Sequence, residues 1–524
     1  MEYDLALDDL NEAARYNLPE EPKSEISRIK ERCEWSSVCP SSVGKVGKVR
    51  KVRKELEPPR LTAGENPELP GASTLLEIRE TLAAGKHAVA ASEILPGDVL
   101  IVEPPLTACL LPEFFGTHCQ HCFSRLRAPI GCPDCSSVAF CGKNCRDAAL
   151  ASYHKYECKI LALLIGSGMS VLSMLALRMI TQEGPRNCRE ISRVAGLAVK
   201  TTPSLSKSAR RRCRRKKLRE FRYGKGGNGG DGDKRAYELV THRERRSPDD
   251  WLERSLMAIF LLKCLQRVDF FETPSRDDEV PSDQEIAVGG LLLKNLQLLQ
   301  FNAHEFFETR IAREHRFRGS KPIYLGVAIY PTVARFNHDC YPAVTRYFVG
   351  RNIVIRATRV LKPGEVVAEN YGPIFTKRTL QERQRELSGR YWFRCNCISC
   401  RENWPQFPNL SNDMVKFKCP TSGCERVHSR AGGRKGSGEC PRCKRVVNLA
   451  DRIADLEECE ELYNEGFAKM EEEKALEAIE IFRDALIKFH RICVPPHKET
   501  HLAEIALSSC MASFGNAWRP PSLG

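Results

Sequence analysis

Seven cysteines and one histidine lie within 40 residues, and this cluster constrains the fold more than any other feature of the sequence. Their spacing is Cys-x2-Cys-x9-Cys-x2-Cys-x5-Cys-x3-Cys-x8-His-x3-Cys, and the residues are Cys119, Cys122, Cys132, Cys135, Cys141, Cys145, His154 and Cys158. This number of ligands suffices for two tetrahedral zinc sites of the closed, structural type. A segment this short cannot bury a core of its own, so we expect metal binding to supply most of its folding free energy.

Two further cysteine clusters follow later in the chain. Cys395, Cys397 and Cys400 supply three ligands, and we expect Cys340, far away in the sequence, to supply the fourth. The other cluster has the spacing of a zinc ribbon and consists of Cys419, Cys424, Cys440 and Cys443. Its alternative interpretation is a set of loop thiols in a glycine-rich insert. The sequence therefore predicts three zinc ions, and a fourth if the ribbon binds metal.

The chain has 24 cysteines in total, and their use depends on the redox compartment. The first residues are acidic and lack the apolar stretch of a secretory signal peptide. We therefore expect a reducing compartment, in which clustered cysteines bind metals rather than form disulfides.

The formal net charge of +14 is concentrated in one segment. Residues 207–225 contain 11 Lys and Arg residues and one acidic residue. This run is equally consistent with a nuclear-localisation signal, a nucleic-acid contact and a solvated loop. Because no surface with interleaved aromatic residues accompanies it, we do not expect sequence-specific nucleic-acid recognition. Residues 160–177 are uncharged but contain Gly166 and Gly168, which predicts a pair of buried helices rather than a membrane span.

Apolar patterning predicts a mixed α+β chain. Alternating and continuous apolar runs favour strands around residues 76–102 and again around 326–355. The segments 160–310 and 456–507 read as mostly helical. In the second of these helical segments, four residues have the intervals of a tetratricopeptide repeat, although a plain amphipathic hairpin is nearly as good an interpretation: Gly466, Ala478, Phe482 and Ala485.

These features, taken in order, resemble the SET and MYND domain-containing lysine methyltransferases. The first cysteine cluster resembles the MYND zinc finger. Residues 75–111 resemble the first half of a SET domain. The second half follows the finger, and its motifs are Gly326–Pro331, Asn337-His338-Asp339-Cys340 and Gly364-Glu365-x5-Tyr371. The Cys395 cluster then resembles a post-SET segment. The resemblance implies interleaved zinc pairing in the finger: Cys119, Cys122, Cys141 and Cys145 on one ion, and Cys132, Cys135, His154 and Cys158 on the other.

The resemblance implies an α+β fold in which a β-rich SET domain is split by the inserted finger. We expect a partial helical repeat and linker at 1–58, SET first half at 70–118, MYND finger at 119–158, a helical insert at 159–320 with a disordered basic loop at 185–250, SET second half at 321–378, post-SET segment at 379–404, zinc ribbon at 405–450 and tetratricopeptide-like helices at 451–524.

The same resemblance implies S-adenosylmethionine as cofactor and a lysine side chain of a protein as substrate. Tyr371 matches the tyrosine whose hydroxyl orients the lysine nitrogen and the methyl group. The residues expected at the cofactor are Lys86, His87, Asn302, Asn337, His338, Tyr371 and Phe393. The chain departs from the family pattern at two positions: where the family has Gly-x-Gly it has Gly85-Lys86-His87, and where the family loop ends in Asn it has Ala343.

Three functions remain open from the sequence. The first is a protein-lysine methyltransferase acting on a histone or another protein. The second is a catalytically weak scaffold whose MYND finger binds proline-rich partners such as deacetylase complexes. The third is a zinc-based nucleic-acid-binding protein. We expect a monomer without membrane association, located in the cytoplasm and nucleus.

Overall fold

A computed structural model of the chain describes residues 11, 23–24, 26–31, 57–197, 234–272, 274–275, 279–412, 415–429 and 437–520. The chain divides into two compact units, Met1–Leu56 and Glu57–Gly524. Most of the partial helical repeat and linker expected at 1–58, and the whole basic run 207–225, lie outside the described residues. The sheets and cysteine clusters discussed below belong to the second unit.

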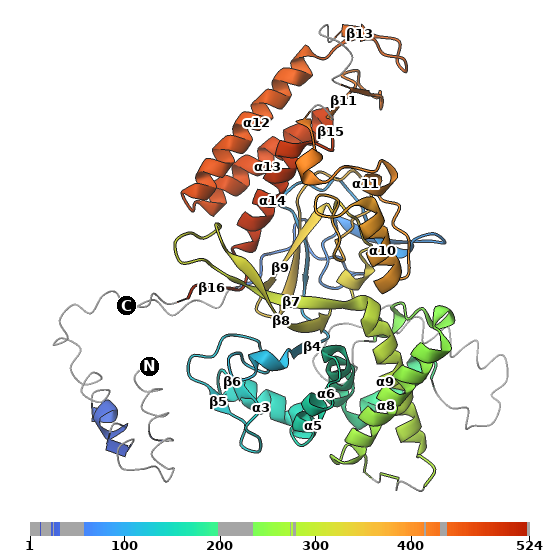
Figure 1. The fold of residues 1–524 in the computed structure, drawn as a ribbon, viewed down its shortest axis with the longest axis vertical. Coiled ribbons are helices and arrows are strands. Elements are labelled where there is room, and N and C mark those ends of the chain that lie inside the picture. The colour runs from blue at the N-terminus through green and yellow to red at the C-terminus, as the bar shows by residue number, and fades with distance from the viewer. Residues whose placement is uncertain are drawn as a thin grey trace. The chain divides into compact units, whose positions relative to one another are not determined.

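Antiparallel strands form the middle of the second unit (Figure 1). A hairpin pairs β1 (Leu76–Thr81) with β2 (Gly85–Ala90). A three-stranded sheet has the order β3-β10-β9, with bounds Val99–Glu103, Asn352–Ala357 and Val344–Val349. A four-stranded sheet has the order β16-β7-β8-β4, with bounds Ala517–Trp518, Ala303–Arg310, Lys321–Ile329 and Thr107–Leu110. In that sheet β16 runs parallel to β7.

Strands from before and after the finger pair directly with each other. Ile101 of β3 lies opposite Ile355 of β10, and Cys109 of β4 lies opposite Val327 of β8. Isolated bridges join Val89 to Val366 and Ile94 to Leu361. The apolar runs read from the sequence supply the shared core, in which Ile101 and Ile355 have no exposed surface. The two halves therefore form one β-rich domain, and the predicted α+β fold class is confirmed.

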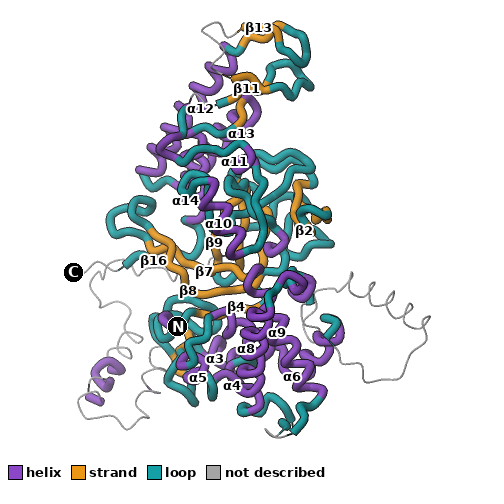
Figure 2. Tube along the Cα trace, turned by 45° about the vertical axis from the view of Figure 1, so that its right-hand side comes forward, coloured by secondary structure: helices purple, strands orange, loops and turns teal. Residues whose placement is uncertain are grey.

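The inserted segment begins with the finger and continues as helices below the four-stranded sheet (Figure 2). The finger contains β5 (Ile130–Gly131), β6 (Ala139–Phe140), α3 (Lys143–Ala151) and α4 (His154–Glu157). The helices are α5 (Leu161–Gly166), α6 (Val171–Val194), α8 (Pro248–Gln266) and α9 (Asp283–Asn302). The uncharged stretch 160–177 thus forms α5 and the start of α6, as predicted. Across the part of the chain that is described, no helix has the length and apolar content to cross a bilayer.

The predicted limits of the disordered loop need correction on both sides. α6 continues through the kink at Gly184, whose φ of 75° suits glycine, to Val194. Residues 234–247 are described as well and contain 3-10 turns at Arg235–Glu238 and Arg243–Arg245. Tyr237 and Arg246 anchor them because both side chains are buried. The basic composition of the neighbouring run hid these anchors in the sequence.

After β10 the chain forms a cysteine-rich segment and a helical region. The cysteine-rich segment holds α10 (Leu380–Arg390), α11 (Ile398–Arg401) and four short strands, β11 (Lys416–Lys418), β12 (Val427–Ser429), β13 (Ser437–Glu439) and β14 (Val446–Asn448). The helical region holds α12 (Ala450–Glu471), α13 (Ala475–Ile492), β15 (Cys493–Val494) and α14 (Lys498–Ala512). A Cβ atom at Gly466 would lie 2.6 Å from the ring of Phe482, so close packing of α12 on α13 requires glycine there.

Candidate active site and metal centres

Four groups of four ligands converge among the described residues, and each fits a tetrahedral zinc ion. Within each group the candidate ligand atoms all lie within 4.8 Å of one another. A Zn–S bond of about 2.3 Å in a tetrahedron places two sulfur atoms about 3.8 Å apart. The observed separations bracket that value, as the individual groups show.

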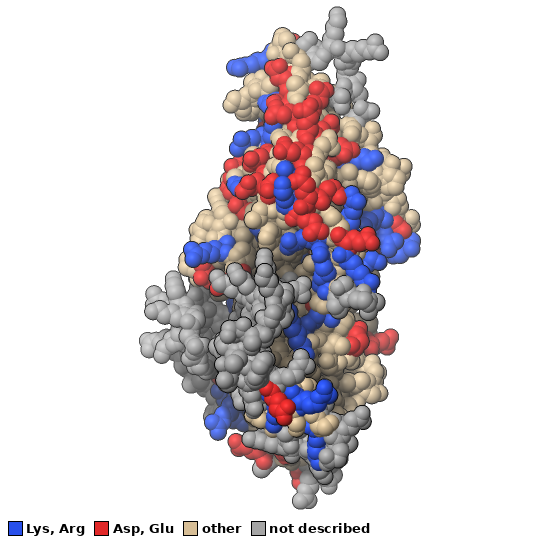
Figure 3. Space-filling model, turned by 90° about the vertical axis from the view of Figure 1, so that its left-hand side faces the viewer, with Lys and Arg blue, Asp and Glu red and all other residues tan. Residues whose placement is uncertain are grey.

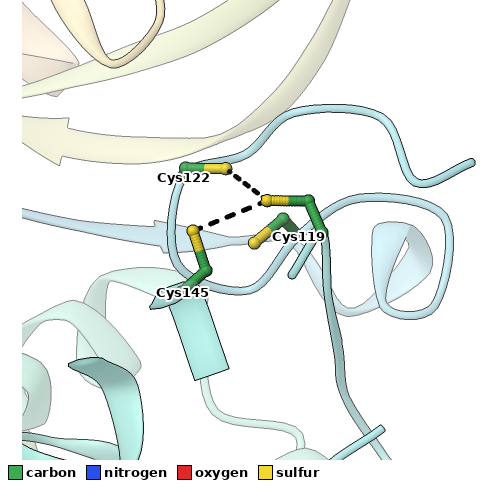
Figure 4. A group of neighbouring side chains, drawn as sticks. Cys119, Cys122 and Cys145 are labelled. Atoms are coloured by element: carbon green, nitrogen blue, oxygen red, sulfur yellow. Dashed lines mark hydrogen bonds between the residues drawn. The ribbon is translucent and has the colours of Figure 1, made fainter. Parts of the chain in front are cut away.

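The finger holds two of these groups, with the interleaved pairing that the family resemblance implied. Cys119, Cys122, Cys141 and Cys145 form the first, in which Cys141 Sγ lies 3.5 Å from the sulfur atoms of both Cys122 and Cys145. Figure 4 shows the sulfur atoms of Cys119, Cys122 and Cys145 pointing toward one another. The second group consists of Cys132, Cys135, His154 and Cys158, with Cys135 Sγ 3.6 Å from His154 Nε2.

The third group brings Cys340, distant in the sequence, to the Cys395 cluster as expected. Cys340 Sγ lies 3.6 Å from Cys400 Sγ and 4.0 Å from Cys395 Sγ, and Cys397 completes the group. The fourth group joins the ribbon residues, with Cys419 Sγ 3.9 Å from Cys443 Sγ and Cys424 Sγ 3.8 Å from Cys440 Sγ. Loop thiols without a metal would have no reason to converge in this way, so the ribbon interpretation is the better one.

A cavity of about 1300 Å³ opens beside the third metal centre. Six of the seven residues expected at the cofactor line this cavity: Lys86, Asn302, Asn337, His338, Tyr371 and Phe393. Strands and loops from both SET halves, the end of α9 and the post-SET segment all contribute to this wall. The cavity also extends to the C-terminal region, where Lys418 of β11 and His490 of α13 line it.

Tyr371 is held by its hydroxyl and by its backbone. The hydroxyl donates to the carbonyl of Phe336 at 2.6 Å, and the backbone N–H donates to His338 Nδ1 at 3.0 Å. Burial raises the pKa of Tyr371 far above its ordinary value of 10, with the nearby Glu369 carboxylate adding to the shift. The phenol therefore stays protonated at neutral pH, with its lone pairs free to accept a further hydrogen bond.

His338 connects this tyrosine to the metal centre. Its Nε2 lies 3.2 Å from Cys340 Sγ, while its Nδ1 accepts the Tyr371 N–H. Burial lowers the pKa of His338 to about 4, which leaves the ring neutral, as these two roles require. The ring is thus committed to the protein. Its backbone N–H and C=O, by contrast, have no hydrogen-bond partner among the described residues.

The two asparagines tie separate segments of the wall together. Asn337 Nδ2 donates to the carbonyl of Ala84, in the turn between β1 and β2, at 3.0 Å. Asn302 Nδ2 donates to the carbonyls of Val240 at 2.9 Å and Leu298 at 2.7 Å. Each asparagine therefore joins parts of the wall that are far apart in the sequence.

Of the two cofactor residues expected in the first SET half, only Lys86 lines the cavity. Its Nζ lies 3.6 Å from Glu238 Oε2. His87 does not line the cavity: its side chain is buried, and its Nδ1 lies 2.9 Å from the carbonyl of Gly85. Successive residues of a strand face opposite sides, so Lys86 and His87 of β2 cannot both face the cavity. The expectation that His87 contacts a cofactor is corrected.

Besides the C-terminal wall, the sequence reasoning missed two further features that line the cavity. Tyr391 lines the cavity, its ring centroid 4.9 Å from that of Tyr371, and its hydroxyl donates to the Tyr371 carbonyl at 3.2 Å. Its place two residues before Phe393 was the available signal. The second feature is the segment from Glu238 to Arg245, which the sequence had assigned to the disordered loop.

Comparisons with known proteins find matches to the same family that the sequence motifs resemble. The MYND finger family matches residues 119–158. Protein-lysine N-methyltransferase SMYD4 of Danio rerio is 24% identical over 82% of this chain, and SMYD4 of Mus musculus is 25% identical over 64%. Histone-lysine N-methyltransferase SMYD3 of Homo sapiens is 20% identical over 72% of this chain and 73% of its own length. The resemblance to the SMYD4 type, suggested by the Tyr371-Gly-Pro373 sequence, is confirmed.

The chain spans 63% of the length of the Danio rerio relative and 47% of the Mus musculus one. Among solved structures, the SET domain of LSMT bound to lysine and AdoHcy matches 85% of this chain and 86% of its own, at 12% identity and a TM-score of 0.26. A TM-score this low does not support a common arrangement over the whole chain.

Proposed function

We propose that this chain, a relative of the SET and MYND domain-containing proteins that resembles SMYD4 among them, transfers methyl groups from S-adenosylmethionine to lysine side chains of other proteins. One observation carries the proposal: a single cavity beside the Cys340 metal centre is lined by the Asn337-His338 loop, Tyr371 and Phe393. The names of the relatives, which are protein-lysine and histone-lysine methyltransferases, support the same activity.

The cavity fits the cofactor in size and in chemistry. A volume of about 1300 Å³ leaves room for a nucleoside with an amino-acid tail together with a lysine side chain. The unpaired N–H and C=O of His338 offer one donor and one acceptor, which is what the edge of an adenine needs. Asn337 and Lys86 add polar groups to the same wall. When bound, the cofactor supplies an electrophilic methyl group on a sulfonium centre.

Orientation and exclusion of water are the contributions of the chain's own residues. Because the Tyr371 hydroxyl already donates to Phe336, its free lone pairs have a fixed direction and can hold the attacking amine in line. Tyr391 and Phe393 add aromatic surface around it, which keeps water from the amine. A raised pKa prevents Tyr371 from serving as a phenolate base, so its role is positioning of the substrate.

Two measurements on the full chain test the proposal. Isothermal titration should show S-adenosylmethionine binding to wild type and none to Asn337→Ala. Asn464→Ala, an exposed asparagine of α12 outside the cavity, is the matched control and should bind as wild type does. Transfer of labelled methyl groups to proteins of a cell extract should follow the same pattern. Wild type that binds no cofactor would overturn the proposal.

The exposed finger supports a second proposal, that it recruits proline-rich partners, with deacetylase complexes among the candidates. The family match at residues 119–158 supports this role, which would persist in a protein without turnover. Fluorescence anisotropy with proline-rich peptides tests it: binding that survives Tyr371→Phe but disappears with Cys132→Ser is the expected result, and no binding to wild type would refute it.

Cytoplasmic and nuclear location is likewise proposed, on the strength of the basic run. Replacing residues 210–217 by neutral ones in a fluorescently tagged chain should reduce nuclear entry without changing cofactor affinity. Unchanged nuclear entry would exclude the run as a localisation signal.

A further inference from the structure

Five basic side chains that have no ion-pair partner among the described residues face the cavity from several elements. Arg245 follows the turn after Val240, Arg394 and Arg401 flank the post-SET cysteines, Lys362 lies in the loop after β10, and Lys418 ends β11. Within the described part of the chain, no carboxylate lies within ion-pairing distance of any of these five. The two arginines, Arg245 and Arg394, also line a smaller hollow together with Trp392.

The remaining cations of the wall have partners close by: two share one carboxylate, and the third stacks on an aromatic ring. Arg335 and Lys86 both pair with Glu238, at 3.3 and 3.6 Å. Arg359 lies with its guanidinium 4.1 Å above the ring of Tyr341, where nearby carboxylates balance its charge. These three residues therefore act as structural contacts of the wall.

Few acidic groups oppose the five unpaired cations. Glu365 lies among them and accepts the backbone N–H of Lys362. Asp339 lies beside Cys340 and accepts the backbone N–H of Tyr341, while Glu80 lies at the β1–β2 hairpin. On the face that Figure 3 shows, acidic side chains gather over the C-terminal helices, where α12 carries Asp455, Glu458 and Glu461. None of the five cations at the cavity belongs to the basic run 207–225.

We propose that the protein substrate presents its lysine within an acidic segment, with Asp or Glu residues on both sides. The inference rests on the proposed methyltransferase function and names the substrate class of that site. Acidic flanks complement Lys362, Arg394 and Arg401, whereas the basic flanks of a histone tail would be repelled. The same cations assist the reaction, because a like charge nearby disfavours the protonated form of the incoming lysine and only the neutral amine attacks.

The third centre and the ribbon give these charges fixed positions. Arg394 and Arg401 adjoin the metal ligands Cys395 and Cys400. Lys418 precedes Cys419 and donates a hydrogen bond to the carbonyl of His490, which joins β11 to the C-terminal helices. A preorganised set of charges discriminates between substrates better than a flexible one, since less ordering is needed on binding.

Three peptides that differ only in their flanks test the inference. Each carries one central lysine and either Glu, Gln or Arg at the three positions on each side, and each is assayed for binding by fluorescence anisotropy and for methyl transfer. At low salt the Glu peptide should exceed the Arg peptide by at least about tenfold in kcat/KM and in affinity, and the difference should shrink as salt rises.

Charge reversal identifies the residues responsible. Lys362→Glu/Arg401→Glu should remove the preference for the Glu peptide, while cofactor affinity stays that of wild type. The matched control is Lys143→Glu/Arg189→Glu, which makes the same change of charge at exposed residues of α3 and α6 outside the cavity. This control should retain the preference in full.

The outcomes separate the two proposals. Wild type that binds no cofactor and methylates no peptide overturns the proposed function and this inference with it. Methylation without a preference, or with a preference for the Arg peptide, overturns the inference alone. Displacement of the Glu peptide by a single-stranded oligonucleotide that binds more tightly would assign the charged wall to nucleic acid and would also overturn it.

Discussion

Tyr371→Phe removes one oxygen atom from the centre of the site. The hydroxyl lost is the one that donates to the carbonyl of Phe336 at 2.6 Å, and the aromatic ring that packs 4.9 Å from Tyr391 remains. The substitution therefore changes hydrogen bonding at one point and leaves the shape of the cavity almost unaltered.

Two free-energy terms can be worked out for this change. Leaving the Phe336 carbonyl without its donor should cost about 1–3 kcal/mol of unfolding free energy. Loss of a preorganised group that acts mainly in the transition state should lower turnover by on the order of a hundredfold, which corresponds to about 2.7 kcal/mol of barrier height. Cofactor affinity should change by less than about twofold, because ground-state binding uses other parts of the wall.

The assay compares kcat, KM and calorimetric cofactor affinity on a substrate verified with wild type. Tyr391→Phe is the matched control, since its hydroxyl donates to the Tyr371 carbonyl and so supports that residue from behind. We expect a smaller loss of turnover for the control than for Tyr371→Phe. Full activity of Tyr371→Phe would show that the catalytic tyrosine is wrongly assigned, and an equal loss of cofactor binding would show that the hydroxyl acts in the ground state.

Three further predictions concern metal content and stability. Elemental analysis should find four zinc ions per chain, and three in Cys440→Ala; two or fewer in folded wild type would refute the post-SET site. Glu157→Gln should lower the unfolding free energy by about 3–5 kcal/mol, because it leaves the buried Arg178, which lies 2.5 Å from Glu157, without its counter-ion. Urea titration measures this loss, and a loss under about 1 kcal/mol would contradict the prediction. Burial opposes ionisation of Glu285, but hydrogen bonds from Ser275, Gln266 and Ser282 outweigh it and lower its pKa from 4.5 to about 2. The stability that the ionised Glu285 adds is present in full above pH 4.5 and should be lost as the pH falls toward 2. The difference in unfolding free energy between wild type and Glu285→Gln should therefore shrink by about 1 kcal/mol between pH 6 and 3.5. A constant difference would refute the assignment.

The metal centres and the split domain could be predicted because their signals are local in sequence or fixed by chemistry. Cysteine spacing determines which thiols can meet at one ion, and an incomplete triad at 395–400 requires a fourth ligand from elsewhere. Apolar runs such as 99–102 and 353–355 identify buried strands, although pairing between them needed the family resemblance.

The rest of the site depends on contacts that no local pattern records. The segment 238–245 forms part of the wall, and the buried side chain of Tyr237 anchors it, yet its composition reads as loop. The commitment of both ring nitrogens of His338 was equally hidden, because their partners Cys340 and Tyr371 approach from different directions. The C-terminal wall arises when β11 pairs with β15, and Lys416 and Val494 are too far apart in sequence for any periodicity to join them.

These contacts connect the third metal centre to the candidate active site. The sulfur of Cys340 is one of four candidate metal ligands and accepts a hydrogen bond from Nε2 of His338, whose other nitrogen fixes the backbone of Tyr371. A metal ligand that is hydrogen-bonded in this way loses its orientation when the ion leaves. His338 would then lose one of its two anchors, and Tyr371 would lose the contact that aligns its backbone. Loss of this ion should therefore abolish alignment of the substrate amine before it unfolds the domain, whereas loss of an ion from the finger, which does not line the cavity, should leave the geometry at Tyr371 intact.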